Sequence, residues 1–88
     1  IKMIVLNVDK ALAKIGFAKV HESNLMVQYE REIPEGYTQC LDICHKKDGR
    51  HLIMSYEKAI NKDGFNNSVG LTLQEGELAC IKMRRMKW

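Results

Sequence analysis

Residues 41–56, LDICHKKDGRHLIMSY, contain two short segments in which apolar and polar side chains alternate. A period of two is typical of β-strands, and Asp-Gly between two such segments is typical of a hairpin with a two-residue loop. We therefore expect the chain to reverse at Asp48-Gly49, with Ile43 opposite Met54 on one face of a sheet. The complete expected pairing is Ile43 with Met54, Leu41 with Tyr56, Cys44 with Ile53, Asp42 with Ser55, and Cys40 with Glu57.

The residues before this hairpin predict two more strands. Leu25, Val27 and Tyr29 alternate with more polar or flexible side chains, as in a half-buried strand. Residues 18–20 can pair with this strand across a tight turn at residues 23–24. A five-residue loop over residues 32–36 would then place Val27 opposite Leu41. The four strands together form an antiparallel meander.

A first helix is expected over residues 3–15. Ile4, Val8, Leu12 and Ile15 recur at spacings of four, four and three residues, which places them on one face of a helix. Gly16 follows directly, as a left-handed C-terminal cap would.

A second helix is expected over residues 73–87. Thr72-Leu73-Gln74-Glu75 has the form of a capping box, with Thr72 as N-cap and Glu75 at the third helical position. Residues 61–70, with two glycines and three asparagines, predict a loop. The fold class is therefore α+β in one domain, residues 1–88, with element order α-β-β-β-β-α. Both helices back one face of the four-stranded antiparallel meander, and the other face stays open.

Composition narrows the class of protein. The chain has 88 residues, 14 basic against 11 acidic, and 45% hydrophobic residues, which is ordinary globular usage. It has no apolar stretch near the 20 residues of a membrane span and no apolar leader region at its start. Three cysteines do not form a secreted disulfide framework, so we expect a cytoplasmic location. Residues 82–88 carry four positive charges and no acid, so the charge is concentrated at one end.

A metal site is not predicted. Cys40, Cys44, His45 and His51 lie within twelve residues, but zinc sites usually take their cysteines from a short turn rather than from along a strand. Small buried thiols account for these cysteines, and we expect no metal and no cofactor.

Catalysis is also not predicted. The expected pairing aligns Gln28, Cys40 and Glu57 in one row of the open face, and Met26, Asp42 and Ser55 in the next. No histidine is clearly placed to activate a cysteine or serine, and no glycine-rich phosphate loop occurs. We therefore expect a protein that is not an enzyme, with a small enzyme on the open sheet face as the third alternative.

The second helix has two apolar faces, where a surface helix usually has one. One face carries Ala79, Met83 and Met86, and the other carries Leu78, Ile81 and Trp88. One face would pack on the sheet, and the other would meet either the first helix or a partner. The leading hypothesis is a small non-enzymatic protein-interaction module that self-associates as a symmetric dimer or binds another protein. Its candidate partner-binding residues are Met83, Met86, Trp88 and Ala79.

Nucleic-acid binding is the alternative function. Lys82, Arg84, Arg85 and Lys87 precede Trp88, and a basic strip with an aromatic residue can contact phosphates and stack on a base. The same cations also complement the helix dipole without any ligand.

The sequence resembles small uncharacterised proteins encoded by phages and prophages of Gram-positive bacteria. The likeness covers residues 16–88 and is carried by residues 25–32, 47–51, 63–67 and 70–72, and by a basic helix closed by Trp88. This resemblance implies no known activity or ligand.

The element order alone resembles that of double-stranded RNA-binding domains, which place a helix before and after a three-stranded sheet. In that family the second helix opens with a lysine cluster, whereas this one opens with residues 72–77, TLQEGE. These acidic residues would repel phosphate, so the resemblance does not extend to RNA binding.

Overall fold

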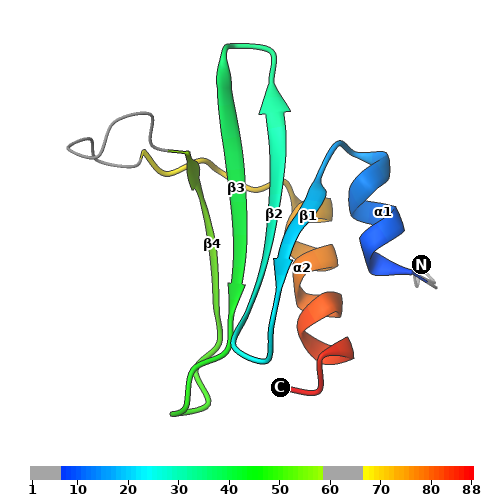
Figure 1. Cartoon of the computed structure of the whole chain (residues 1–88), viewed down its shortest axis with the longest axis vertical. Coiled ribbons are helices and arrows are strands. Elements are labelled where there is room, and N and C mark those ends of the chain that lie inside the picture. Colours follow the sequence, from blue (N-terminus) through cyan, green and yellow to red (C-terminus); the bar gives the residue numbers. More distant parts are fainter. Residues whose placement is uncertain (1–6, 59–66) are drawn as a thin grey trace.

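The computed structural model describes residues 7–58 and 67–88, and it confirms the α+β fold (Figure 1). Four strands form one antiparallel sheet in the order β1-β2-β3-β4. The elements are α1 (Val8–Lys14), β1 (Ala18–Glu22), β2 (Met26–Ile33), β3 (Tyr37–Cys44), β4 (Leu52–Glu57) and α2 (Leu73–Arg85).

Both helices lie on one side of the sheet, near β1 and β2, and β4 forms the edge farthest from them (Figure 1). The core between the layers consists of fully buried side chains from every element except β1 and β4. Its largest members are Leu12, Phe17, Val27, Tyr29, Leu41, Ile43 and Leu78. The alternation in β2 and β3 therefore buries every second residue against the helices.

The first helix begins later than predicted. Asn7, which the sequence pattern places inside the helix, is extended with φ −140° and caps α1 by accepting a hydrogen bond from the Lys10 N–H at 3.0 Å; residues 3–6 lie outside the described residues. Gly16 follows the helix with φ +101°, as its predicted role of C-terminal cap requires. Thr72 accepts from the Glu75 N–H at 3.1 Å, and Glu75 accepts from the Thr72 N–H at 3.0 Å. The predicted capping box is confirmed, and it fixes the start of α2.

The predicted pairing of β3 with β4 is wrong by one residue. Ile43 lies opposite Ile53, not Met54, and Cys40 lies opposite Tyr56. The reversal is a turn in which the Gly49 N–H donates to the Lys46 carbonyl at 3.1 Å. Residues 45–51 therefore connect the two strands outside the ladder. This connection has an odd number of residues, whereas the predicted two-residue loop would give an even number. Because side chains alternate, this shift of one residue moves every side chain of β4 to the face opposite the predicted one.

The pairing of β2 with β3 differs from the prediction by two residues. Ile33 pairs with Tyr37 across a three-residue loop, so Val27 lies opposite Ile43 rather than Leu41. Gly36 closes this loop with φ +101°, a conformation that glycine adopts without strain. A shift of two residues keeps each side chain on its expected face.

Candidate functional site

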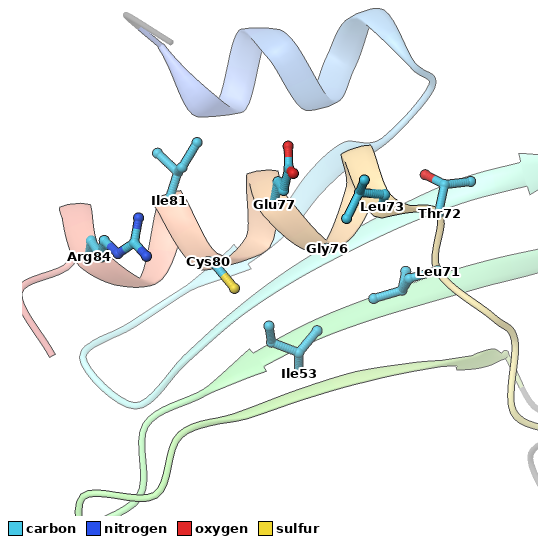
Figure 2. Close-up of a pocket in the computed structure, with 9 residues that line it drawn as sticks. All are labelled: Ile53, Leu71, Thr72, Leu73, Gly76, Glu77, Cys80, Ile81 and Arg84. Carbon is cyan, nitrogen blue, oxygen red and sulfur yellow. The ribbon is translucent and has the colours of Figure 1, made fainter. Parts of the chain in front are cut away.

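A groove between α2 and β4 is a concave apolar surface in the part of the chain that the structure describes. It encloses about 580 Å³ and is lined by residues of β4, of the approach to α2, and of α2 itself. Figure 2 shows Cys80 pointing from α2 toward Ile53 of β4, with Leu71 beside them. The lining residues are Ile53, Leu71, Thr72, Leu73, Gly76, Glu77, Cys80, Ile81 and Arg84.

The groove forms because the residues of β4 that face the helices are Ile53 and Ser55, not the predicted Met54 and Tyr56. Ile53 now lies on the helix side of the sheet, opposite the buried Ile43, but it is only half-buried. Of the α2 residues drawn in Figure 2, Cys80 points toward Ile53, and Gly76, one turn earlier, has no side chain. The layer between α2 and the sheet is therefore incompletely filled at this edge.

Leu73 stays 80% exposed beside the groove. On the opposite face of β4, Leu52 is 42% exposed and Met54 41%. On α2, Leu73, Glu77, Cys80 and Arg84 follow one another at spacings of four, three and four residues, so they form one outward stripe. The sequence contains this spacing, but an apolar helical pattern does not reveal it, because Glu77 and Arg84 are charged.

The backbone edge of β4 is covered over only part of its length. The Glu57 N–H donates to the Asn67 carbonyl at 2.8 Å, and the Val69 N–H donates to the Ser55 carbonyl at 3.0 Å. Alternation in an antiparallel ladder points the peptide groups of Ile53 to the same outer edge. Among residues 7–58 and 67–88, no backbone group bonds those of Ile53.

The candidate partner residues on α2 are largely used inside the fold. Ala79 is completely buried, and Met83, Met86 and Trp88 are partly buried against the core. The opposite apolar face of α2 is also occupied, because Leu78 is buried in the same core. The second of the two predicted apolar faces thus packs within the chain, which is one of the two options that the pattern left open.

Trp88 brings the basic end of α2 against the β3–β4 hairpin. Its ring centroid lies 5.2 Å from that of His45 and 6.0 Å from that of His51. The two imidazoles stack at 4.7 Å, with their Nδ1 atoms 3.2 Å apart. The basic residues after Lys82 therefore lie at the same end of the molecule as Lys46, Lys47 and Arg50, a proximity that the sequence did not reveal.

Lys82 is not part of this exposed basic end. Its side chain is 11% exposed, and its Nζ lies 3.1 Å from an Asp9 carboxylate oxygen and 2.8 Å from a Glu22 oxygen. Lys19 completes the cluster by donating to Asp9 at 2.9 Å. Lys82 is thus held between α1 and β1 rather than presented to phosphate.

Asp9 is the centre of that cluster. Burial alone would raise its pKa, but hydrogen bonds from Tyr29, Lys19 and Lys82 outweigh burial and lower the pKa to about 2. The Tyr29 hydroxyl donates at 2.6 Å, which ties α1 to β2. The same burial, together with the Asp9 charge, raises the pKa of Tyr29 far above its ordinary value.

A second buried polar cluster is centred on Arg31. Its guanidinium lies 2.8 Å from a Glu75 carboxylate oxygen, donates to Gln39 Oε1 at 2.7 Å, and donates to the Ile15 carbonyl at 3.1 Å. It also lies 4.2 Å above the Phe17 ring. Arg31 thereby connects β2 to both helices and to β3.

The open face does not have the rows predicted for it. Ser55 and Glu57 lie on the helix side of β4, so neither joins Cys40 or Asp42. Asp42 is buried and accepts from the Tyr56 hydroxyl at 2.7 Å and from Gln28 Nε2 at 3.2 Å. Burial raises the pKa of the Cys40 thiol, and nearby acidic groups raise it further. The thiol is therefore held in its unreactive protonated form.

Among the described residues, no group of three His, Cys, Asp or Glu side chains could hold a metal ion. The histidine pair lies in the hairpin connection, whereas Cys40 and Cys44 stay on β3 as free, buried thiols. No helix in residues 7–58 and 67–88 is long and apolar enough to span a membrane.

No protein-family model, curated protein or solved structure matches the chain. The resemblance to phage-encoded proteins therefore stays an expectation.

Proposed function

We propose that this chain is a small non-enzymatic protein-interaction module that binds protein through the groove between α2 and β4. The observation that carries the proposal is Leu73, which is 80% exposed beside an apolar groove. Single exposed apolar residues are common on proteins, but a groove with apolar side chains from two elements, here Ile53 of β4 and Leu73 of α2, is typical of an interaction site.

The neighbouring strand edge supports the same function. Exposed sheet edges are normally blunted by charge, by a bulge or by a covering segment. In β4 the covering segment, residues 67–69, ends beside Ser55 and leaves Ile53 open. A partner that fills the groove can thus bond the backbone and bury apolar side chains in one step.

The polar groups of the fold argue for a structural rather than a chemical use. Asp9, Glu75 and Asp42 each have two or more hydrogen-bonding or ionic partners. A general acid or base needs to be accessible to a substrate. These three carboxylates instead connect elements of the fold to one another.

The proposal can be tested by placing a photo-crosslinking amino acid at position 73 in cells that produce the protein. The matched control places it at position 20, since Val20 is also exposed, at 52%, but lies on β1. We expect protein adducts of defined mass from position 73 and none of these from position 20. Equal labelling at both positions, or none at position 73, would refute the proposal.

Nucleic-acid binding is a second candidate, favoured by the contact of Trp88 with His45 and His51. This contact joins two basic spots into one end of the molecule. Because Trp88 is the one tryptophan, its fluorescence reports oligonucleotide binding directly. We expect binding that weakens steeply with salt, with a smaller salt slope for Arg84→Gln and an unchanged slope for Lys14→Gln on α1. Unmeasurable binding at low salt would eliminate this candidate.

A further inference from the structure

We propose that the groove and the free edge of β4 bind a second copy of this chain, with the two β4 strands paired antiparallel about a two-fold axis at Leu52. This inference rests on the proposed function and names its partner. It follows from three features of the edge: its backbone bonding, its side chains and its charge.

The backbone limits where a strand can add. Residues 67–69 already cover the edge from Ser55 to Glu57, so an added strand can extend only along residues 50–54. A two-fold axis at Leu52 satisfies this limit, because it places residue 50 of one copy opposite residue 54 of the other. Ile53 then faces residue 51 of the second copy, which directly precedes β4. If the added strand extends the alternation by this one residue, its peptide groups point outward like those of Ile53, and four new backbone hydrogen bonds form, two on each side of the axis.

The side chains on both sides of the sheet gain from this pairing. On the open side, Leu52 meets its own copy, with Met54 next along the strand; both are about two-fifths exposed in the single chain. On the helix side, Ile53 and the groove below α2 are covered by the hairpin of the second copy. Cross-strand apolar contacts of this kind stabilise antiparallel pairs.

Charge favours an antiparallel second copy over a parallel one. The chain enters α2 beside the end of β4, where residues 67–69 pair, and leaves it beside the start of β4, where Trp88 meets His51. The start of β4 is net basic, because Asp48, which pairs with Arg50, is outnumbered there by Lys46, Lys47, Arg50 and Arg84. At its end Lys58 is paired with Glu30, so Glu57 and Glu77 leave a net negative charge. A two-fold axis sets the basic end of each copy against the acidic end of the other.

The other edge of the sheet is unsuited to the same pairing. On β1 the register shifts between Lys19 and His21, which leaves Val20 in a bulge. Lys19 and Glu22 also join the charged cluster with Lys82. A bulge and paired charges are the usual protection of an edge strand, so one edge of this sheet is protected and the other is open.

The register can be tested by disulfide cross-linking of purified protein. In a Cys80→Ser background, Leu52→Cys places two thiols on a non-hydrogen-bonded pair with Cα atoms about 4.5 Å apart, within the range for a disulfide. Met54→Cys places them roughly 13 Å apart, at about 3.3 Å per residue. We expect covalent dimer from Leu52→Cys under mild oxidation, and little from Met54→Cys or from Val20→Cys as the edge control.

Sedimentation equilibrium supplies the second measurement. We expect the unmodified chain to dimerise, Leu52→Lys to weaken the dimer at least tenfold, and Val20→Lys to leave it unchanged. A monomer at every concentration, or equal cross-linking at positions 52 and 54, would overturn the second copy as the occupant. Adducts of position 73 with other proteins would in that case still support the interaction module, so the two failures are distinguishable.

Discussion

The buried pair of Arg31 and Glu75 provides the strongest stability prediction. Glu75 is 5% exposed and Arg31 21%, and the two side chains are 2.8 Å apart. Arg31→Met keeps most of the side-chain volume but leaves the Glu75 carboxylate buried without its cation. Removing one partner of a buried ion pair costs about 3–5 kcal/mol. Because Arg31 is about one-fifth exposed, we expect a loss near the lower end, about 3 kcal/mol.

This loss is large for a chain of 88 residues, whose free energy of unfolding should be roughly 4–13 kcal/mol. With a urea m-value of about 1.5 kcal/mol/M, the unfolding midpoint should fall by about 2 M. The matched control is Arg50→Met, because Arg50 is 84% exposed and its partner Asp48 is 51% exposed. That variant should leave the urea midpoint nearly unchanged.

A double variant tests the mechanism rather than the size of the effect. Glu75→Gln keeps an oxygen to cap the Thr72 N–H but removes the charge. Alone it should lower the free energy of unfolding, since Arg31 then loses its carboxylate. In the Arg31→Met background it should raise the free energy of unfolding, because it removes the uncompensated buried charge. The same sign in both backgrounds, measured by urea titration, would refute the ion-pair argument.

Three further predictions concern individual positions. Gly16 has φ +101°, and a Cβ there would lie 3.0 Å from Arg31 Cδ. Gly16→Ala should therefore lower the free energy of unfolding, measured by urea titration, by over about 1 kcal/mol. Gly76 has open space around it, so Gly76→Ala should instead stabilise α2 by about 1 kcal/mol. A thiol reagent should modify exposed Cys80 quickly and the two buried cysteines only on unfolding, because burial raises their thiol pKa; three fast thiols would contradict this. Because the pKa of Asp9 is lowered, the free energy of unfolding should fall as the pH drops from about 4 to about 2. The expected loss is about 1–2 kcal/mol, after allowing for the partial exposure of Asp9. In an acid titration followed by circular dichroism, Asp9→Asn should flatten that pH dependence.

The elements of the fold could be predicted from the sequence because each has a local cause. Thr72 and Glu75 mark the start of α2 because their side chains form the hydrogen bonds of a capping box. The alternation around Val27 indicates which side chains face the helices. A pairing that is shifted by two residues leaves those side chains on the same face, so the prediction of the face survives the error in register. Signals of this kind involve neighbours along the chain, so they survive without knowledge of the tertiary structure.

The register of β4 could not be predicted because its cause is not local. Asp48-Gly49 favours a two-residue loop, but the described turn begins at Lys46 and places Gly49 at φ +85°. The histidines on either side of the turn stack on each other, and their rings contact the tilted ring of Trp88, which is distant in sequence. A local turn preference is worth little against contacts that involve the other end of the chain.

The clusters around Asp9 and Arg31 also escaped prediction, for a related reason. The sequence places Lys82 in a basic strip because its sequence neighbours are basic, yet its partners Asp9 and Glu22 lie more than fifty residues away. Charge patterns along a chain describe its surface only where the side chains are exposed. Buried charges have to be paired, and their partners come from the tertiary fold.

The shift of one residue in β4 is also what produces the candidate site. In the predicted frame, Met54 and Tyr56 would have filled the layer under α2, and Ile53 would have faced solvent on the open side. In the described frame, the shorter Ile53 and Ser55 face α2, and Gly76 lies opposite them. The layer is left underfilled, while Leu52 and Met54 are exposed on the other face of the same edge. An edge strand that is apolar on both faces and open in its backbone is an aggregation hazard unless it has a specific partner. A second copy, paired in one register about Leu52, removes that hazard while using the surfaces that the shift exposed.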